Sequence, residues 1–293
     1  METVQTESSF SQKIRHSFEL VKFSHTIFAL PFALAGYFVA GRGRFEWRSL
    51  LWVVVSVLGA RTAAMAFNRL ADHRIDALNP RTQARHLPQG LLTRSFVLAL
   101  TVLSSIVFLF AASQINRLCL MLAPPCLALL FIYSLAKRFT HYTQIFLGIA
   151  LGMAPIGAAI AATGAWNWDA LWLGGAVLFW VAGFDLLYAL QDLEFDRAHG
   201  LKSLSVRLGI RESFRISSLF HLIFLFLLAA YGFRTGLGKF YWIGLCLVAG
   251  LLVWEHLILK EDLKKIQASF FTANGLLSLL FLFFTLLDTL SSR

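Results

Sequence analysis

Residues 68–76 read NRLADHRID and overlap the end of an apolar segment, 50–71, that is long enough to cross a bilayer. Helical residues four apart differ by only about 40° in direction, so Asn68, Asp72 and Asp76 present their oxygens from one face. Carboxylates beside hydrocarbon are costly and need a partner or a function. This stretch therefore predicts a membrane helix with a chemically active polar end.

The rest of the chain has the composition of an integral membrane protein. Of its 293 residues, 58% are hydrophobic and 14% are charged, whereas charged residues make up about a quarter of a soluble domain. We predict an all-α fold in which residues 1–293 form one membrane domain with nine spans. These are expected at 19–41, 50–71, 94–113, 117–135, 142–162, 170–190, 213–233, 240–259 and 267–288. Pro124 and Pro125 are expected to kink the fourth span rather than end it.

The net charge of +10 is distributed in a way that argues against a nucleic-acid partner. Lys and Arg concentrate in alternate connecting segments, chiefly 69–94 and 197–215. By the positive-inside rule, these segments and the N-terminus face the cytoplasm. Residues 1–18 contain no secretory signal. We therefore expect a multi-pass protein of the cell inner membrane, with the lipid bilayer as its surroundings and a site facing the cytoplasm.

A second acidic cluster lies in DLLYALQDLEFD, residues 185–196. In a continuous helix, Asp185, Asp192 and Asp196 would fall within about 40° of one another. Asn79-Pro80 and Gly200 are predicted helix stops. The polar segments 72–93 and 191–212 are predicted to be cytoplasmic cap loops. Both clusters should therefore meet on one side of the membrane.

Two opposed carboxylate clusters suit a hard cation and a diphosphate. Mg²⁺ takes oxygen ligands, commonly carboxylates together with phosphate oxygens and waters. A diphosphate beside a lipid-facing cavity indicates an isoprenoid substrate, whose allylic cation needs an aromatic wall. Tyr133 and Tyr188 are candidates for that wall. Flanking basic residues are candidates for phosphate contacts: Arg81, Arg85, Lys202 and Arg207.

Three motifs together resemble the UbiA-type superfamily of intramembrane aromatic prenyltransferases over essentially the whole chain. They are NRLADHRIDALNPRTQARHLPQG (68–90), YSLAKRFTHYTQIFLG (133–148) and DLLYALQDLEFDRAHGLKSLSVRLG (185–209). The first resembles the family's NxxxDxxxD signature and the loop after it, and the third its second aspartate motif. The second resembles a segment of 4-hydroxybenzoate polyprenyltransferases. The resemblance implies nine helices in a ring around a central cavity that opens to the bilayer.

The resemblance also implies roles for individual residues. Asn68, Asp72 and Asp76 would bind Mg²⁺ or diphosphate, with Asp192 and Asp196 opposite them. Asp185 would be a further ligand or a general base. Lys137 and Arg138 would approach the substrate head groups, Arg138 being a candidate for an acceptor carboxylate. The implied substrates are a polyprenyl diphosphate and an aromatic acid such as 4-hydroxybenzoate, in ubiquinone or menaquinone biosynthesis.

Alternatives remain at two levels. KFSHTIFALPFA (22–33) is more similar to a sister group linked to menaquinone synthesis by the futalosine route, which leaves the acceptor open. Outside this enzyme class, a cation-coupled transporter would also use carboxylates, but near the bilayer midplane on broken helices. The DGxxAR…GxxxD pattern of CDP-alcohol phosphotransferases does not occur in the sequence. No oligomeric state is predicted.

Overall fold

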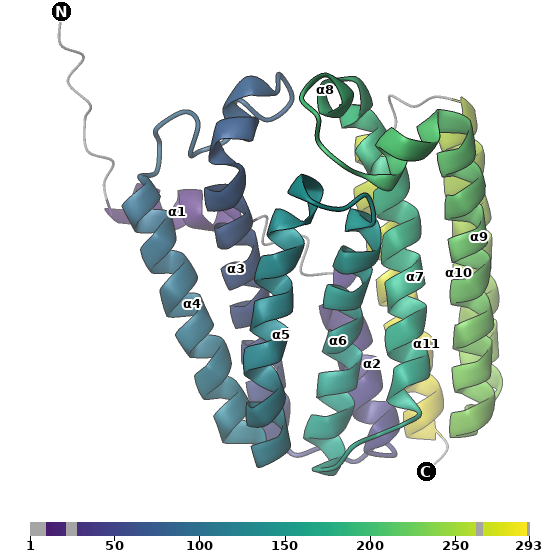
Figure 1. The fold of residues 1–293 in the computed structure, drawn as a ribbon. Helices are drawn as coiled ribbons and strands as arrows, with labels where there is room; N and C mark the ends of the chain where they lie inside the picture. The colour runs from purple at the N-terminus through teal and green to yellow at the C-terminus, as the bar shows by residue number, and fades with distance from the viewer. Residues whose placement is uncertain (1–9, 22–27, 262–265, 292–293) are drawn as a thin grey trace, which may run out of the picture.

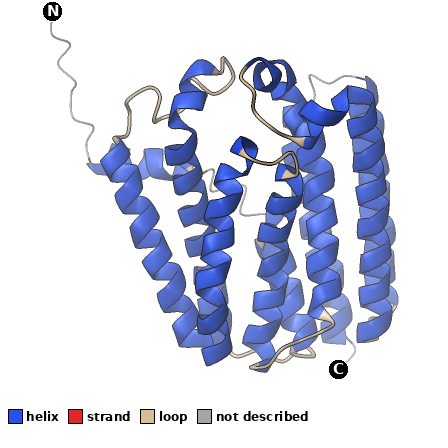
Figure 2. Cartoon of the chain, viewed as in Figure 1, coloured by secondary structure: helices blue, strands red, loops and turns tan. Residues whose placement is uncertain are grey.

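The computed structural model describes residues 10–21, 28–261 and 266–291, in which helices form the whole regular structure and no strand occurs (Figures 1 and 2). The α-helices are α1 (Phe10–Leu20), α2 (Leu30–Ala40), α3 (Trp47–Leu78), α4 (Arg94–Ile115), α5 (Arg117–Leu135), α6 (Thr143–Thr163), α7 (Ala170–Tyr188), α8 (Leu193–Ala198), α9 (Leu204–Thr235), α10 (Lys239–Glu261) and α11 (Ile266–Ser291). Two short 3₁₀ helices are η2 (Ala136–Arg138) and η3 (Ala189–Asp192).

Local sequence explains where several helices begin and end. Thr93 caps α4 by accepting from Phe96 N at 3.2 Å, and Ser203 caps α9 in the same way. A hydroxyl at this position satisfies one of the unpaired N–H groups of the first turn. The predicted stop at Asn79-Pro80 is confirmed, because α3 ends at Leu78. Pro124 and Pro125 lie inside α5, as expected.

The long helices pack in a closed circuit. Contacts run from α2 to α3, through α4 and α5 to α6 and α7, and then through α9, α10 and α11 back to α2. Figure 1 shows the long helices standing side by side, with the short α1 lying crosswise beside α3 and α4. The predicted all-α ring-like order is therefore confirmed, and eight of the described helices are long and apolar enough to cross a membrane. The protein is a multi-pass membrane protein.

The first predicted span, 19–41, is wrong as a single helix within the described residues. Helix α1 ends at Leu20 and the 11-residue α2 begins at Leu30, while residues 22–27 lie outside the described part of the chain. At 1.5 Å per residue, α2 covers only about 17 Å of a hydrocarbon core that is about 30 Å thick. The count of nine spans is therefore not confirmed.

The two predicted cap loops are shorter and more helical than expected. Helix α3 continues to Leu78, six residues beyond the predicted start of the first loop. Helix α8 and the start of α9 occupy much of 191–212. The reason is local, because the residues after Asp72 include good helix formers and reach no strong breaker before Pro80. The acidic residues of α3 therefore stand on a rigid helix.

Helices α6 and α7 approach each other unusually closely. A Cβ atom added to Gly148 would lie 2.4 Å from the carbonyl oxygen of Leu178, and one added to Gly152 would lie 2.5 Å from that of Gly174. Small residues at such spacing let membrane helices pack backbone to backbone. On the other side of α7, Trp180 packs among Phe32, Phe224 and other buried aromatic rings. Both contacts fix the position of α7, which leads into the second acidic cluster.

Candidate active site

The first acidic cluster lies on the last turns of α3. Asp72 and Asp76 are buried, each with 4% of its surface exposed, and Asn68 donates its side-chain amide to Asp72 Oδ2 at 3.5 Å. The predicted single helical face is confirmed for this cluster, because α3 is continuous through all three residues. Buried carboxylates require charged or hydrogen-bonding partners, and each of these two has them.

Asp72 is held by the basic residues of η2. Lys137 Nζ lies 2.6 Å from Asp72 Oδ2, and Arg138 Nη2 lies 3.2 Å from Oδ1. Arg138 also donates to the carbonyl oxygens of Ala71 and Ser134. The segment after α5 is therefore tied to the end of α3 by charge-assisted hydrogen bonds, which are stronger than neutral ones. Both basic residues were expected at the site from the sequence.

Asp76 is held by a loop that folds back over α3. Arg85 Nη1 lies 2.7 Å and 2.8 Å from the two carboxylate oxygens of Asp76. Arg69 is itself buried, and its Nη1 lies 3.8 Å from Asp76 Oδ2. Thr82 also donates its hydroxyl to the backbone oxygen of Asp76. The cap loop thus places one predicted phosphate-binding residue, Arg85, directly on the acidic cluster.

The second cluster does not lie on one helical face as predicted. Helix α7 ends at Tyr188, η3 follows over Ala189–Asp192, and α8 begins at Leu193. A 3₁₀ turn winds more tightly than an α-helix, and this change redirects Asp192 relative to Asp185. The new direction points Asp192 at Asn79, whose amide donates at 2.9 Å, and at Arg81. These contacts satisfy the carboxylate and account for the departure.

Arg81, in the loop that follows α3, holds Asp192 of the second cluster through a two-pronged contact. Its Nε lies 2.7 Å from Asp192 Oδ1, its Nη2 pairs with Oδ2, and its Nη1 donates to Tyr188 OH at 3.3 Å. The guanidinium carbon also lies 5.5 Å from the Tyr188 ring centre. Burial alone would lower the pKa of Arg81, but the hydrogen bonds and charge of Asp192 outweigh it and raise that pKa above its usual value. Arg81 is therefore a permanent cation at this junction.

Asp185 and Asp196 differ from the other three acids, since neither forms an ion pair or hydrogen bond with a described residue. Asp196 nevertheless lies close enough to Asp192, Lys137, Arg81 and Asp72 to interact with them electrostatically. Asp185 interacts in the same way with Tyr133. The structure thus brings the end of α3, η2 and the α7–α8 junction together around one charged centre.

Arg61 and Lys202 have contacts that the sequence did not predict. Tyr133 interacts with Asp72 and Asp185 and also with Arg61, to which no role was assigned. The Nε of Arg61 is buried and has no hydrogen-bond partner in the described part of the chain. An arginine inside an apolar helix, seven residues before Asn68, was the available signal. Lys202 lies near η2 rather than on an acid, with Nζ 3.5 Å from the Phe139 oxygen and its backbone N–H bonded to Lys137 O at 2.9 Å.

The donor set fits magnesium. Asn68, Asp72, Asp76, Asp192 and Asp196 offer only oxygen atoms, which Mg²⁺ prefers. No three of these carboxylates have oxygens within 4.8 Å of one another. Within the described ranges, only His16, Glu19 and His86 bring three possible ligand atoms that close together. Lys and Arg side chains pair with three of these carboxylates. The carboxylates would hold a metal once these cations turn toward the phosphate oxygens of a diphosphate.

The His16, Glu19 and His86 group attaches α1 to the cap loop. His86 Nε2 lies 3.0 Å from Glu19 Oε2, and Arg15 Nε lies 2.9 Å from Oε1. The hydrogen bond from Arg15, followed by that from His86, lowers the pKa of Glu19 to about 2. His86 follows Arg85 directly, so α1 supports the loop that covers Asp76.

Comparison with known proteins gives this arrangement its context. Residues 29–285 match the UbiA prenyltransferase family. The chain belongs to the UbiA prenyltransferase family. Members that resemble it include the 4-hydroxybenzoate octaprenyltransferase of Vibrio vulnificus (strain CMCP6), 31% identical over 80% of this chain and 83% of that protein. That of Vibrio cholerae (strain O395) is 34% identical over 78% and 81%. The protein is therefore a prenyltransferase enzyme.

Solved structures of UbiA homologues share the fold. The apo structure of a homologue from Aeropyrum pernix K1 has a TM-score of 0.83 and 32% identity, and it covers 90% of this chain and 98% of that one. A homologue from Archaeoglobus fulgidus bound to GPP and Mg²⁺ has a TM-score of 0.69, with 17% identity over 94% and 99%. At that identity, the second likeness supports the fold alone.

Proposed function

We propose that this UbiA-family enzyme transfers a polyprenyl group from a polyprenyl diphosphate to an aromatic acid such as 4-hydroxybenzoate, with Mg²⁺ as cofactor, in quinone biosynthesis. One observation carries the proposal. Acidic side chains from the end of α3 and from the α7–α8 junction meet at one centre and are interleaved with basic side chains. The basic residues in contact are Arg69, Arg81, Arg85, Lys137 and Arg138.

The basic residues serve the diphosphate. Each already contacts a carboxylate, and a short rotation would exchange that contact for a phosphate oxygen, to which Arg binds in a two-pronged fashion. The residues that would hold Mg²⁺ are Asn68, Asp72, Asp76, Asp192 and Asp196. When bound there, Mg²⁺ would withdraw charge from the diphosphate leaving group. The basic side chains add to that effect by stabilising the negative charge that develops as the allylic C–O bond breaks.

Asp185 suits the proton step. The electron pair of the C–O bond leaves with the diphosphate, and the prenyl carbon then bonds to the ring carbon ortho to the phenol. That carbon must next lose its proton. Asp185 has no ion pair with a described residue, unlike Asp72, and it lies near Tyr133. We assign Asp185 as the general base, and Tyr133 and Tyr188 to the wall around the prenyl cation.

The carboxylate of the acceptor has two candidate partners. Arg138 was expected from the sequence, but it already donates to Asp72, Ala71 and Ser134. Arg61 has a buried Nε without a described partner, and it lies close to Tyr133. A hydrogen bond to a charged group contributes about 1.5–3 kcal/mol, or about ten- to a hundred-fold in affinity. Replacement by Gln of whichever arginine binds the acid should therefore raise KM for 4-hydroxybenzoate but not for 4-hydroxybenzamide.

The comparisons support prenyl transfer to an aromatic acceptor, while the identity of the acceptor is part of the proposal. Similar bacterial proteins are 4-hydroxybenzoate octaprenyltransferases, and the Archaeoglobus fulgidus homologue, which shares the fold, has been solved with GPP or DMAPP together with Mg²⁺. Membership of a prenyltransferase family also disfavours the transporter hypothesis. The motif that favours a futalosine-route acceptor lies partly at 22–27, outside the described residues. That acceptor is kept as the second candidate.

The test offers purified enzyme one labelled polyprenyl diphosphate and a panel of aromatic acids, and identifies the product by mass. We expect a prenylated 4-hydroxybenzoate. Asp196→Asn should abolish turnover, whereas Glu194→Gln should preserve it, because Glu194 is an exposed acid two residues away. Full turnover by Asp196→Asn would remove the acidic centre from the mechanism. Product from another acid alone would replace the acceptor.

The orientation proposed is an N-terminus and active site on the cytoplasmic side of the inner membrane. Its support is the concentration of Lys and Arg around the site. A tag placed before residue 10 should be cleaved by protease in inverted inner-membrane vesicles and protected in spheroplasts. The reverse pattern would overturn the orientation.

A further inference from the structure

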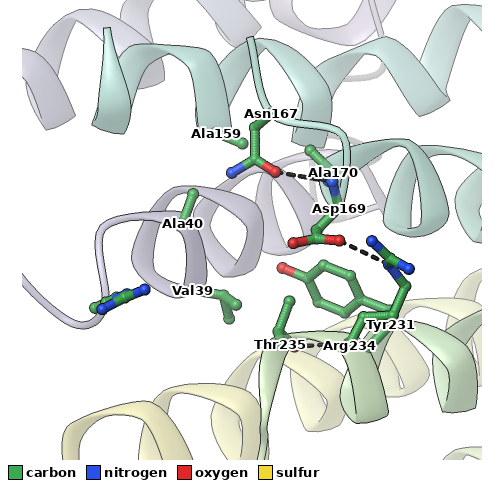
Figure 3. Close-up of a pocket in the computed structure, with 10 residues that line it drawn as sticks. Val39, Ala40, Ala159, Asn167, Asp169, Ala170, Tyr231, Arg234 and Thr235 are labelled. Carbon is green, nitrogen blue, oxygen red and sulfur yellow. Dashed lines mark hydrogen bonds and ion pairs between the residues drawn. The ribbon is translucent and has the colours of Figure 1, made fainter. Parts of the chain in front are cut away.

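A polar cavity lies at the end of the bundle opposite the acidic centre. It measures about 220 Å³ and is formed where α2 and α9 end and α7 begins (Figures 1 and 3). Ligand sites for drug-sized molecules usually span about 300–1,000 Å³, while one water needs only about 10–15 Å³. The cavity therefore suits a ligand of intermediate size. Nothing in the proposed prenyl transfer uses it.

An acidic and hydroxylic wall lines one side of this cavity. Arg234 Nε lies 2.7 Å from Asp169 Oδ1, while Oδ2 has no partner in the described ranges. The Tyr231 side chain is only 2% exposed, yet its hydroxyl forms no hydrogen bond with a described residue. Figure 3 shows this hydroxyl and the Asp169 carboxylate close together and facing the cavity. Both oxygens are therefore available to accept hydrogen bonds from a donor in the cavity.

A basic residue completes the lining. Arg42 contributes to the cavity and is exposed, with no ion pair to any described acid. Its φ of 49° makes it the one non-glycine residue with positive φ in the described chain. Such a backbone is unfavourable for an L residue with a long side chain, and it is typical of functional positions. The turn after α2 therefore holds a free guanidinium at the cavity.

The surroundings indicate the membrane–water interface. Trp168 is 69% exposed and Phe233 is 76% exposed, and both belong to the end of the bundle that carries the cavity. Aromatic side chains gather where the bilayer meets water, at the depth of the lipid head groups. A ligand at this depth is most abundantly a phospholipid.

We propose that this cavity binds the phosphoethanolamine head group of a membrane phospholipid. Its ammonium would donate to Asp169 Oδ2 and Tyr231 OH. Its phosphate would contact Arg42. A purely anionic head group would place no cation against Asp169, so the site selects a zwitterion carrying a primary ammonium.

The test compares lipids with matched acyl chains by native mass spectrometry of the detergent-purified protein. We expect phosphatidylethanolamine adducts to exceed phosphatidylglycerol adducts at least five-fold. Arg42→Gln, Tyr231→Phe and Ala40→Met should each abolish that preference; the last fills the cavity without altering a charge. Arg48→Gln is the matched control, because Arg48 bonds to Gln114 and does not line the cavity. Prenyl transfer by all four variants verifies folding.

Each remaining outcome decides against the proposal. Equal adducts of the two lipids would show that the head group is not recognised. An unchanged preference in Tyr231→Phe and Ala40→Met would show that recognition occurs elsewhere. Soluble phosphoethanolamine that binds with the same dependence on Arg42, while the lipid does not, would make the ligand a free solute. Either result overturns the head-group assignment.

Discussion

The close approach of α6 and α7 supports a stability prediction of definite size. A Cβ at position 148 would lie 2.4 Å from Leu178 O, about 1 Å inside an ordinary C···O contact of about 3.3–3.6 Å. That oxygen belongs to helical backbone and cannot move without α7. Overpacking of this kind costs about 1–3 kcal/mol. The gain in helix propensity from Gly to Ala, about 1 kcal/mol, acts in the opposite direction.

A matched control removes the propensity contribution. Gly157 lies on the same helix, and a Cβ there meets nothing within 4 Å. The difference between Gly148→Ala and Gly157→Ala in free energy of unfolding therefore isolates the overpacking, about 1–3 kcal/mol. Thermal unfolding in one detergent should show Gly148→Ala melting lower, at about 2–4 °C per kcal/mol. Equal melting temperatures, or a higher one for Gly148→Ala, would refute the backbone contact.

Three further predictions concern the acidic centre and its support. Asp76→Asn should lower the free energy of unfolding by about 3–5 kcal/mol, because it leaves Arg85 and Arg69 without their buried partner. Thermal unfolding, with Glu194→Gln as the control, measures this loss of stability. A loss no greater than that of the control would contradict the prediction. EDTA should stop prenyl transfer and excess Mg²⁺ should restore it, whereas turnover indifferent to chelation would count against a metal cofactor. Because the pKa of Glu19 is lowered to about 2, its stabilising charge is fully present above its usual pKa of about 4.5 and is lost only as pH falls through about 2. Amide hydrogens of α1, with exchange corrected for intrinsic rate, should therefore be less protected in Glu19→Gln than in wild type at pH 5 as well as at pH 8. A difference that disappears at pH 5 would contradict the lowered pKa.

Much of this structure could be predicted from the sequence, because its main signals are strong and local. Runs of about twenty apolar residues locate eight of the nine expected spans to within a few residues at most boundaries. The spacing of Asn68, Asp72 and Asp76 depends only on helical geometry, so one helix face was predictable. Lys137 and Arg138 were selected by motif and do contact Asp72.

The missed features depend on contacts between distant segments. The change from α-helix to 3₁₀ helix after Tyr188 accompanies the pairing of Asp192 with Arg81, 111 residues away in sequence, and no local pattern encodes that. Likewise, nothing around Arg61 indicates that its Nε would lie buried near Tyr133. The outer cavity requires the ends of α2, α7 and α9 to be placed together. Such features follow from tertiary packing, which periodicity does not report.

The pairing of Asp72, Asp76 and Asp192 with arginine and lysine bears on how the bilayer stays electrically sealed. A bare pocket of negative charge at the rim of a lipid-embedded bundle would draw sodium, protons and water inward, and would offer them a conducting route. With tethered cations beside Asp72, Asp76 and Asp192, the same pocket attracts lone mobile ions less strongly. Between reaction cycles, these tethered cations keep the charged end of the bundle closer to electrical neutrality.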